Sequence, residues 1–140
     1  MIAQITTETL AAIMAETIAE NGREACGLLF GRADRITAHR AARNVADDPR
    51  TRFEIDPAVL LAAHRAARSG GPALVGCYHS HPAGSAEPSA RDAADAAPNG
   101  WLWLIVGAGE AKLWRAVRDG TVHRRFDPVP FACPGPLRLR

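Results

Sequence analysis

Lysine, paired cysteines and long hydrophobic runs are scarce in this chain, and each scarcity argues against a class of protein. Lys112 is the only lysine, and the arginines that supply the remaining positive charge are scattered instead of forming the basic tract of a nucleic-acid interface. The three cysteines, Cys26, Cys77 and Cys133, form no CxxC pair and are odd in number, which argues against a disulfide framework. No apolar run approaches the ~20 residues that span a bilayer.

The rest of the composition is that of an ordinary globular domain. Apolar residues make up 47% of the 140 residues, charged residues make up 23%, and the net charge is +2. The N-terminal segment MIAQITTETL has no basic region followed by an apolar stretch, so it does not resemble a secretory signal. Free thiols suit a reducing compartment. We therefore expect a cytoplasmic protein with no membrane partner.

Hydrophobic periodicity predicts an α/β (α+β) fold, in which helices flank a single mixed β-sheet. Asp56-Pro57 is a strong helix start, because a capping carboxylate precedes a proline at the first helical position. Three helices are predicted, at 7–20, at 57–68 and from about Ser89. Strands are predicted at 24–31, 35–45, 51–55, 73–78, 101–106, 110–117 and 121–126, the last two as a hairpin around Asp119-Gly120.

The predicted domain spans residues 1–126, and a proline-rich C-terminal tail spans 127–140. The tail contains four of the ten prolines, so no regular place in the core is expected for it. Residues 137–140 are expected to be loose or to pair with a sheet edge. The sequence leaves the oligomeric state open, since the tail could support a dimer or simply trail.

The most informative stretch is Tyr78-His79-Ser80-His81-Pro82, at the end of an apolar run. Residues i and i+2 of a strand share a face, so the imidazoles of His79 and His81 can share one cation. Pro82 cannot donate to a ladder and ends the strand where loops leave room for substrate. Asp92, in the first turn of the next helix, can supply a carboxylate. Such a three-ligand set suits one zinc ion per chain and leaves a fourth position for water.

Each of these residues also has an ordinary structural explanation. A lone His-x-His on a strand is more often polar surface. Ser89-Ala90-Arg91-Asp92 matches a helix capping box, and Asp92 is not expected to cap and ligate together. Glu24 by itself is explained as an exposed carboxylate at a strand start. Cys77 shares the face of the histidines but lies further back along the strand, so core filling is expected. Only the combination favours a metal site.

The motifs together resemble those of the JAMM (MPN-plus, Mov34-type) zinc metalloproteases. His-x-His-Pro is followed, ten intervening residues after the second histidine, by an aspartate with a serine three residues before it. Upstream, Glu24-Ala25-Cys26-Gly27-Leu28-Leu29-Phe30-Gly31 is similar to the first motif of that family. Asn44-Val45 and Phe53-Glu54-Ile55-Asp56-Pro57 resemble its connecting segment. The resemblance covers roughly residues 6–126, with no departure at the five signature positions.

The resemblance implies a JAMM/MPN-like fold with a cytidine-deaminase-like architecture, and a metallopeptidase of the bacterial single-domain type. His79, His81 and Asp92 would hold zinc, Glu24 would be the general base, and Ser89 would hydrogen-bond the oxyanion. The implied partner is the C-terminal tail of a ubiquitin-like or sulfur-carrier protein, cut at a peptide or isopeptide bond. A thin Gly-Gly tail could bind as an added strand.

Other functions fit the sequence less well. A non-catalytic MPN-type scaffold that binds protein partners is the main alternative, but such scaffolds typically lack the ligands present here. A zinc deaminase needs a Cys-x-x-Cys ligand pair, which is missing. The scattered arginines do not favour a nucleic-acid partner. The remaining histidines, His39, His64 and His123, have no partner at ligand spacing and are expected on the surface.

Overall fold

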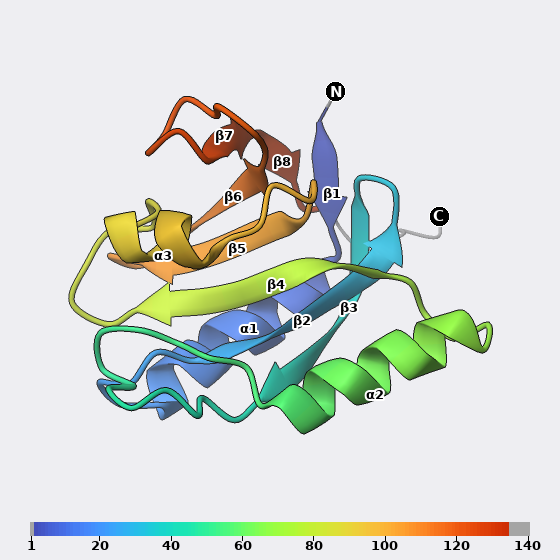
Figure 1. Ribbon diagram of the computed structural model, residues 1–140, viewed down its shortest axis with the longest axis horizontal. Helices are drawn as coiled ribbons and strands as arrows, with labels where there is room; N and C mark the ends of the chain where they lie inside the picture. The colour runs from blue at the N-terminus through green and yellow to red at the C-terminus, as the bar shows by residue number, and fades with distance from the viewer. Residues whose placement is uncertain (1, 135–140) are drawn as a thin grey trace, which may run out of the picture.

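The computed structural model describes residues 2–134 and contains one mixed sheet with helices on both faces (Figure 1). The α+β fold predicted from the sequence is therefore confirmed. The helices are α1 (Thr7–Ala19), α2 (Pro57–Arg68) and α3 (Ala90–Asp95). The strands are β1 (Ala3–Ile5), β2 (Cys26–Arg32), β3 (Arg35–Ala42), β4 (Leu74–His81), β5 (Leu102–Gly107), β6 (Glu110–Ala116), β7 (Phe126–Val129) and β8 (Phe131–Ala132). No helix among the described residues is long and apolar enough to cross a membrane.

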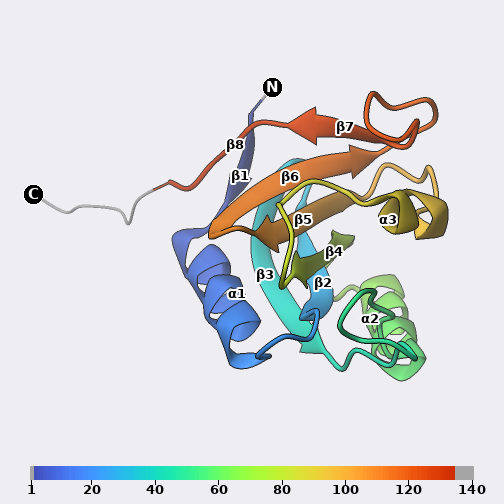
Figure 2. The same ribbon diagram turned by 90° about the vertical axis from the view of Figure 1, so that its left-hand side faces the viewer.

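The strand order is β7-β6-β5-β4-β2-β3-β1-β8, so β4 lies inside the sheet between β2 and β5. β4 runs antiparallel to β2 and parallel to β5, and β1 runs parallel to both β3 and β8. The two ends of this order are consecutive in the chain. β7 pairs with β6 and β8 pairs with β1, so one short segment joins both margins of the curled sheet (Figure 2).

The helices cover opposite faces of the sheet. On one face, Ile13 of α1 packs against Leu29, Tyr78 and Leu104. On the other face, α2 covers β2 through Ala63, and α3 lies over a cluster that contains Cys77, Trp103 and Ile105. Figure 2 shows the sheet between α1 on one side and α2 with α3 on the other. Alternation along β4 therefore sends Tyr78 and Ser80 towards α1, and Cys77, His79 and His81 towards α2 and α3.

Close packing around Tyr78 fixes the middle of β4 against its neighbours. The Tyr78 hydroxyl donates to a carboxylate oxygen of Glu16 on α1 at 2.7 Å. Gly27 makes room for this ring, since a Cβ there would come within 2.4 Å of the Tyr78 hydroxyl and 2.3 Å of the Arg40 carbonyl oxygen. Only glycine fits between these groups without moving the backbone. The glycine in the first motif thus serves strand packing beneath the histidines.

Four predictions about secondary structure were wrong in part or whole. Residues 51–55 form no strand and make only an isolated bridge between Asn44 and Ile55. The partner of β6 begins at Phe126, not at Thr121, because the connection after β6 is longer than a tight turn. The segment 127–132, for which no regular place in the core was expected, completes β7 and forms β8, and Val129 and Phe131 pack against the core. The short strand β1 was not predicted at all. Residues 137–140 lie outside the described part of the chain.

Candidate metal centre

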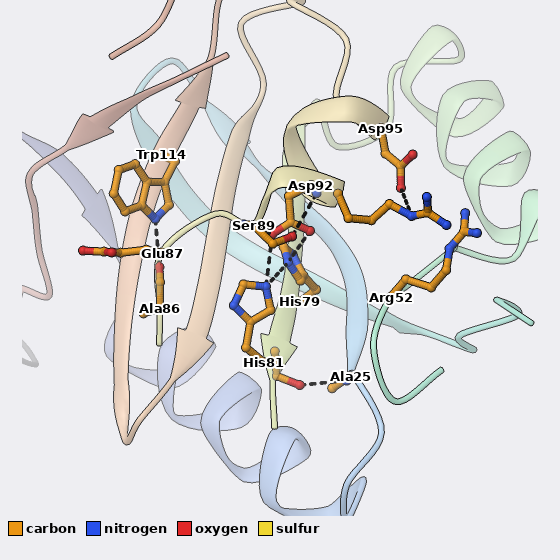
Figure 3. Close-up of polar contacts among 12 residues, drawn as sticks. Ala25, Arg52, His79, His81, Ala86, Glu87, Ser89, Asp92, Asp95 and Trp114 are labelled. Carbon is orange, nitrogen blue, oxygen red and sulfur yellow. Dashed lines mark hydrogen bonds and ion pairs between the residues drawn. The ribbon is translucent and has the colours of Figure 1, made fainter. Parts of the chain in front are cut away.

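The two histidines lie at the C-terminal end of β4, where the sheet holds them on both sides. His79 pairs with Cys26 of β2 and with Ile105 of β5, and His81 pairs with Gly107. His79 is fully buried, while the His81 side chain is slightly exposed. Their Nε2 atoms lie 3.1 Å apart on the face covered by α3 (Figure 3). The structure therefore brings the predicted pair together, with both ring nitrogens directed at one point.

Asp92 reaches this point from the first turn of α3. One carboxylate oxygen lies 3.1 Å from the His79 Nε2, and the other lies 3.0 Å from the His81 Nε2. The same carboxylate accepts from the Ser89 amide at 2.9 Å, while the Ser89 hydroxyl accepts from the Asp92 amide at 3.0 Å. Asp92 thus caps α3 while its carboxylate contacts both histidines, and its two oxygens with four lone pairs leave room for a metal ion as well.

Glu24 immediately precedes β2 and is buried, with 4% of its surface exposed. A carboxylate oxygen of Glu24 and one ring nitrogen each of His79 and His81 lie within 4.8 Å of one another. One Glu24 oxygen, Oε1, is buried without a hydrogen-bond donor among the described residues. Burial raises the pKa of Glu24 from 4.5 to about 7; nearby His81 opposes the rise, and the charges of Asp92 and Asp48 add to it. The interpretation of Glu24 as an exposed carboxylate is therefore excluded.

The protonation of His81 follows from its neighbour on the loop after β4. The His81 Nδ1 lies 2.7 Å from the Ser85 carbonyl oxygen, which can only accept, so Nδ1 carries the proton. In a neutral ring Nε2 then carries a lone pair, and its contact with the Asp92 carboxylate becomes a hydrogen bond only when Nε2 is protonated as well. Burial lowers the pKa of His79. For His81, burial also opposes protonation, but the bonds to Asp92 and Ser85 outweigh it and raise the pKa.

The donor set fits a divalent metal ion. Burial alone would raise the pKa of Asp92, but the contacts with His79 and His81 outweigh it and hold that pKa well below its ordinary value. An ionised carboxylate, two imidazole nitrogens and a second buried carboxylate with an unpaired oxygen converge here. Nitrogen and carboxylate oxygen donors of this kind suit zinc and other divalent ions of the first transition row.

Two polar residues outside the donor set fix Glu24 beside the histidines. The Ser80 hydroxyl accepts from the Ala25 amide at 2.8 Å, and the Ser80 amide donates to the Ala25 carbonyl at 3.0 Å. Ser80 faces away from His79 and His81, and it holds Ala25 just before β2. The Asn44 amide group donates to the Glu24 carbonyl at 3.0 Å. Apart from the Asn44-Val45 motif, the sequence carried no signal for this second anchor.

The loop from Pro82 to Pro88 is tied down over the site. The Trp114 indole nitrogen donates to the Ala86 carbonyl at 3.0 Å (Figure 3). Ala86 directly follows Ser85, whose carbonyl holds His81. Gly107 allows the loop to lie on β5, since a Cβ there would come within 2.5 Å of the Ser85 carbonyl. A groove of about 220 Å³ opens at this strand end on the α1 face, and His81, Ser80 and Ile18 contribute to its walls. The loop is thus held by hydrogen bonds at Ser85 and Ala86, and the His81 side chain is the slightly exposed edge of the site.

Other candidate ligands lie elsewhere. Cys77 is buried in the core with Trp103 and Phe126, as expected, and burial raises the pKa of its thiol. His64 and His123 are exposed, as expected. His39 is half-buried against the Tyr78 ring, so the prediction that it lies on the surface was wrong.

Comparison with known proteins agrees with this geometry. Residues 6–118 match the family model described as prokaryotic homologs of the JAB domain. A desampylase of Haloferax volcanii is 40% identical over 84 residues, which are 59% of this chain and 60% of that protein. A desampylase of Pyrococcus furiosus is 36% identical over 71% of each chain. A Thermus thermophilus protein named a probable TtuB-protein conjugate cleaving protease is 38% identical over 59% of this chain and 55% of its own length. The first and third alignments thus span less than two thirds of those relatives.

Solved structures extend the likeness to the whole fold. A protein of Desulfitobacterium hafniense superimposes with a TM-score of 0.79 and 28% identity over 97% of this chain and 95% of its own. A JAB1/MPN domain protein of Archaeoglobus fulgidus shares the fold, with a TM-score of 0.57 and 18% identity over 94% and 98% of the two chains. The fold, the motif spacing and the family match agree, and this chain belongs to the family of prokaryotic homologs of the JAB domain.

Proposed function

We propose that this protein is a zinc metallopeptidase that hydrolyses a peptide or isopeptide bond at the C-terminus of a ubiquitin-like or sulfur-carrier protein. The observation that carries the proposal is the convergence of His79, His81 and Asp92, with atoms 3.0 to 3.1 Å apart, beside the buried carboxylate of Glu24. Relatives named desampylase and probable TtuB-protein conjugate cleaving protease support the class of substrate.

In this proposal His79, His81 and Asp92 hold one zinc ion per chain. Bound zinc supplies a polarised substrate carbonyl and water with a pKa near neutrality. The histidines suit this role because the proton on the His81 Nδ1 is held by the Ser85 carbonyl, which leaves Nε2 as a donor to the metal. The carboxylate of Asp92 is kept ionised by the imidazoles beside it.

Glu24 acts as the general base. Its carboxylate accepts a proton from the attacking water and then gives that proton to the leaving amine, so the products are a carboxylic acid and an amine. A pKa of about 7 allows both transfers near neutral pH. The Ser89 hydroxyl oxygen accepts from the Asp92 amide, which leaves its own hydrogen free to donate to the developing oxyanion. Capping and catalysis by Ser89 are therefore compatible.

The surroundings of His81 suit a thin substrate tail. β4 is paired with β2 and β5 on its two sides, so an added strand cannot pair with β4 and the tail must lie beyond the strand end. A groove on the α1 face of this strand end is walled on one side by Gly107, Ala108 and Gly109. We propose that this groove receives part of the carrier, with the exposed Ile18 as a contact, and that the Gly-Gly tail passes over the end of β4 to the histidine side chains on the other face.

The test combines hydrolysis with metal analysis. Two substrates would be offered, a ubiquitin-like carrier with a C-terminal peptide extension and the same carrier joined to a lysine side chain, with products identified by mass spectrometry. Zinc would be counted by elemental analysis of the purified chain. We expect the wild type to contain about one zinc per chain, to lose hydrolysis with chelator and to regain it when zinc is added.

Three variants separate the roles of the residues. Glu24→Gln should keep zinc and lose at least ~10²-fold in kcat. Asp92→Ala should lose both zinc and hydrolysis. Ser89→Ala, the matched control for the cap, should keep zinc and lose about 10²-fold in kcat. Full zinc and full activity in Asp92→Ala would refute the ligand assignment. Loss of zinc in Glu24→Gln alone would instead make Glu24 the third ligand.

A further inference from the structure

The two histidines of the site differ in what holds their second ring nitrogen. The Nδ1 of His81 donates to the Ser85 carbonyl oxygen at 2.7 Å. The Nδ1 of His79 is buried and has no hydrogen-bond partner in the part of the chain that the structure describes. Imidazoles that bind metals are normally oriented by a hydrogen bond from the nitrogen that does not bind. A different interaction must therefore set the rotation of the His79 ring.

Two aromatic rings enclose His79. Phe53 stacks on it, with ring centroids 4.2 Å apart and planes 18° from parallel. Trp103 meets it edge to face, at 5.6 Å and 89°. Phe53 and Trp103 also contact each other edge to face at 5.7 Å. Because one ring covers a face of the imidazole and the other abuts it at a right angle, turning His79 about its side-chain bonds would break both contacts.

Phe53 is held in place from both sides along its loop. The Asn44 side chain donates to the Arg52 carbonyl at 3.1 Å and accepts from the Glu54 amide at 3.1 Å. These bonds fix the backbone immediately before and after Phe53. The same Asn44 donates to the Glu24 carbonyl at 3.0 Å. One side chain thus places both the proposed base and the ring that packs on a proposed metal ligand.

We propose that Phe53 is a positioning residue for the metal centre, whose stacked ring aims the His79 Nε2 at the cation in place of the hydrogen bond that His79 lacks. The inference rests on the proposed zinc site. It differs from simple core filling, because a core residue would change the stability of the chain without changing its affinity for metal. Trp103 contacts the His79 ring from β5, and Phe53 contacts it from the loop between β3 and α2.

The experiment measures the zinc dissociation constant by competition with a chromophoric chelator, and the urea midpoint of the metal-free protein. Phe53→Leu keeps an apolar side chain but removes the ring, and Phe53→Tyr keeps the ring. Ile55→Ala is the matched control, since Ile55 lies on the same loop and packs against the same aromatic cluster. Cobalt-substituted samples give a spectroscopic readout of ligand geometry.

We expect Phe53→Leu to weaken zinc binding by roughly 10- to 100-fold and to alter the visible spectrum of bound cobalt. Phe53→Tyr should restore both, and Ile55→Ala should lower the urea midpoint while leaving the zinc dissociation constant unchanged. Equal zinc affinity of Phe53→Leu and wild type, or equal weakening in Ile55→Ala, would overturn this inference alone. Failure of the wild type to bind zinc would overturn the proposed function as well.

Discussion

Replacing Glu24 by glutamine should abolish a loss of stability that the metal-free protein undergoes as the pH rises, although it also removes the proposed base. Glu24 is 4% exposed, and one of its oxygens has no donor among the described residues. Burial is the main cause that raises its pKa from 4.5 to about 7. An ionised Glu24 is thus unfavourable in the folded chain but not in the unfolded chain, and glutamine carries no such charge.

The size and sign follow from these pKa values. Below pH 4.5 the carboxyl group is protonated in both states, and its contribution to stability is fully present. As the pH rises towards about 7, the unfolded chain ionises first and the wild type loses stability relative to the variant. A difference of one in pKa corresponds to about 1.4 kcal/mol, so the relative loss reaches about 3 kcal/mol above neutrality.

The assay is urea unfolding in the presence of chelator for the wild type and Glu24→Gln, repeated between about pH 4.5 and pH 8. The amide itself shifts the stability by a constant amount, so only the change in the difference with pH is compared. Glu54→Gln, which alters an exposed carboxylate on the neighbouring loop, is the control and should show no such change. A difference between wild type and Glu24→Gln that stays constant over this range would refute the burial argument.

Three further variants probe the supports of the site. Ser80→Ala should leave the buried Ala25 amide without an acceptor and lower the free energy of unfolding by about 1 to 3 kcal/mol, measured in urea; an unchanged midpoint would contradict this. Asn44→Ala removes five hydrogen bonds to the surrounding backbone and should cost about 3 kcal/mol and reduce kcat, with calorimetry and hydrolysis as readouts. Gly107→Ala should push the Ser85 carbonyl off its position, cost about 1 to 3 kcal/mol and weaken zinc binding; retention of wild-type zinc affinity would show that the loop can shift without effect.

Helices and strands that depend on neighbouring residues could be predicted from the sequence, and those that depend on distant partners could not. The capping carboxylate of Asp56 and the proline after it placed α2 within its observed bounds, and the Asp56 side chain accepts from the Ala58 amide at 3.0 Å. β1 and β8 are short and pair with partners distant in sequence, so the residues around them carry no pattern that predicts a strand. Residues 51–55 alternate like a strand, but Asn44 satisfies the Arg52 carbonyl and Glu54 amide, and no ladder forms.

The features of the metal centre also divide into those that the local sequence predicts and those that depend on the folded chain. The twofold period of a strand sufficed to predict that His79 and His81 share a face. That Glu24 is buried beside them depends on the register in which Cys26 pairs with His79, which no local pattern specifies. That Asp92 caps α3 and meets both histidines depends on the path of the loop after Pro82. The stacking of Phe53 on His79 is a contact across 26 positions, visible only once the chain is folded.

The joining of both sheet margins by one C-terminal segment has a consequence for biosynthesis. β8 pairs with β1, so one edge of β1 stays uncovered until Phe131 and Ala132 have been synthesised. Until then β1 and β6 each present an open edge, which is a template for pairing with other chains. The segment from β7 to β8 covers both edges together. We therefore expect nascent chains that end before Phe126 to aggregate, and complete folding to begin only after synthesis has passed residue 132.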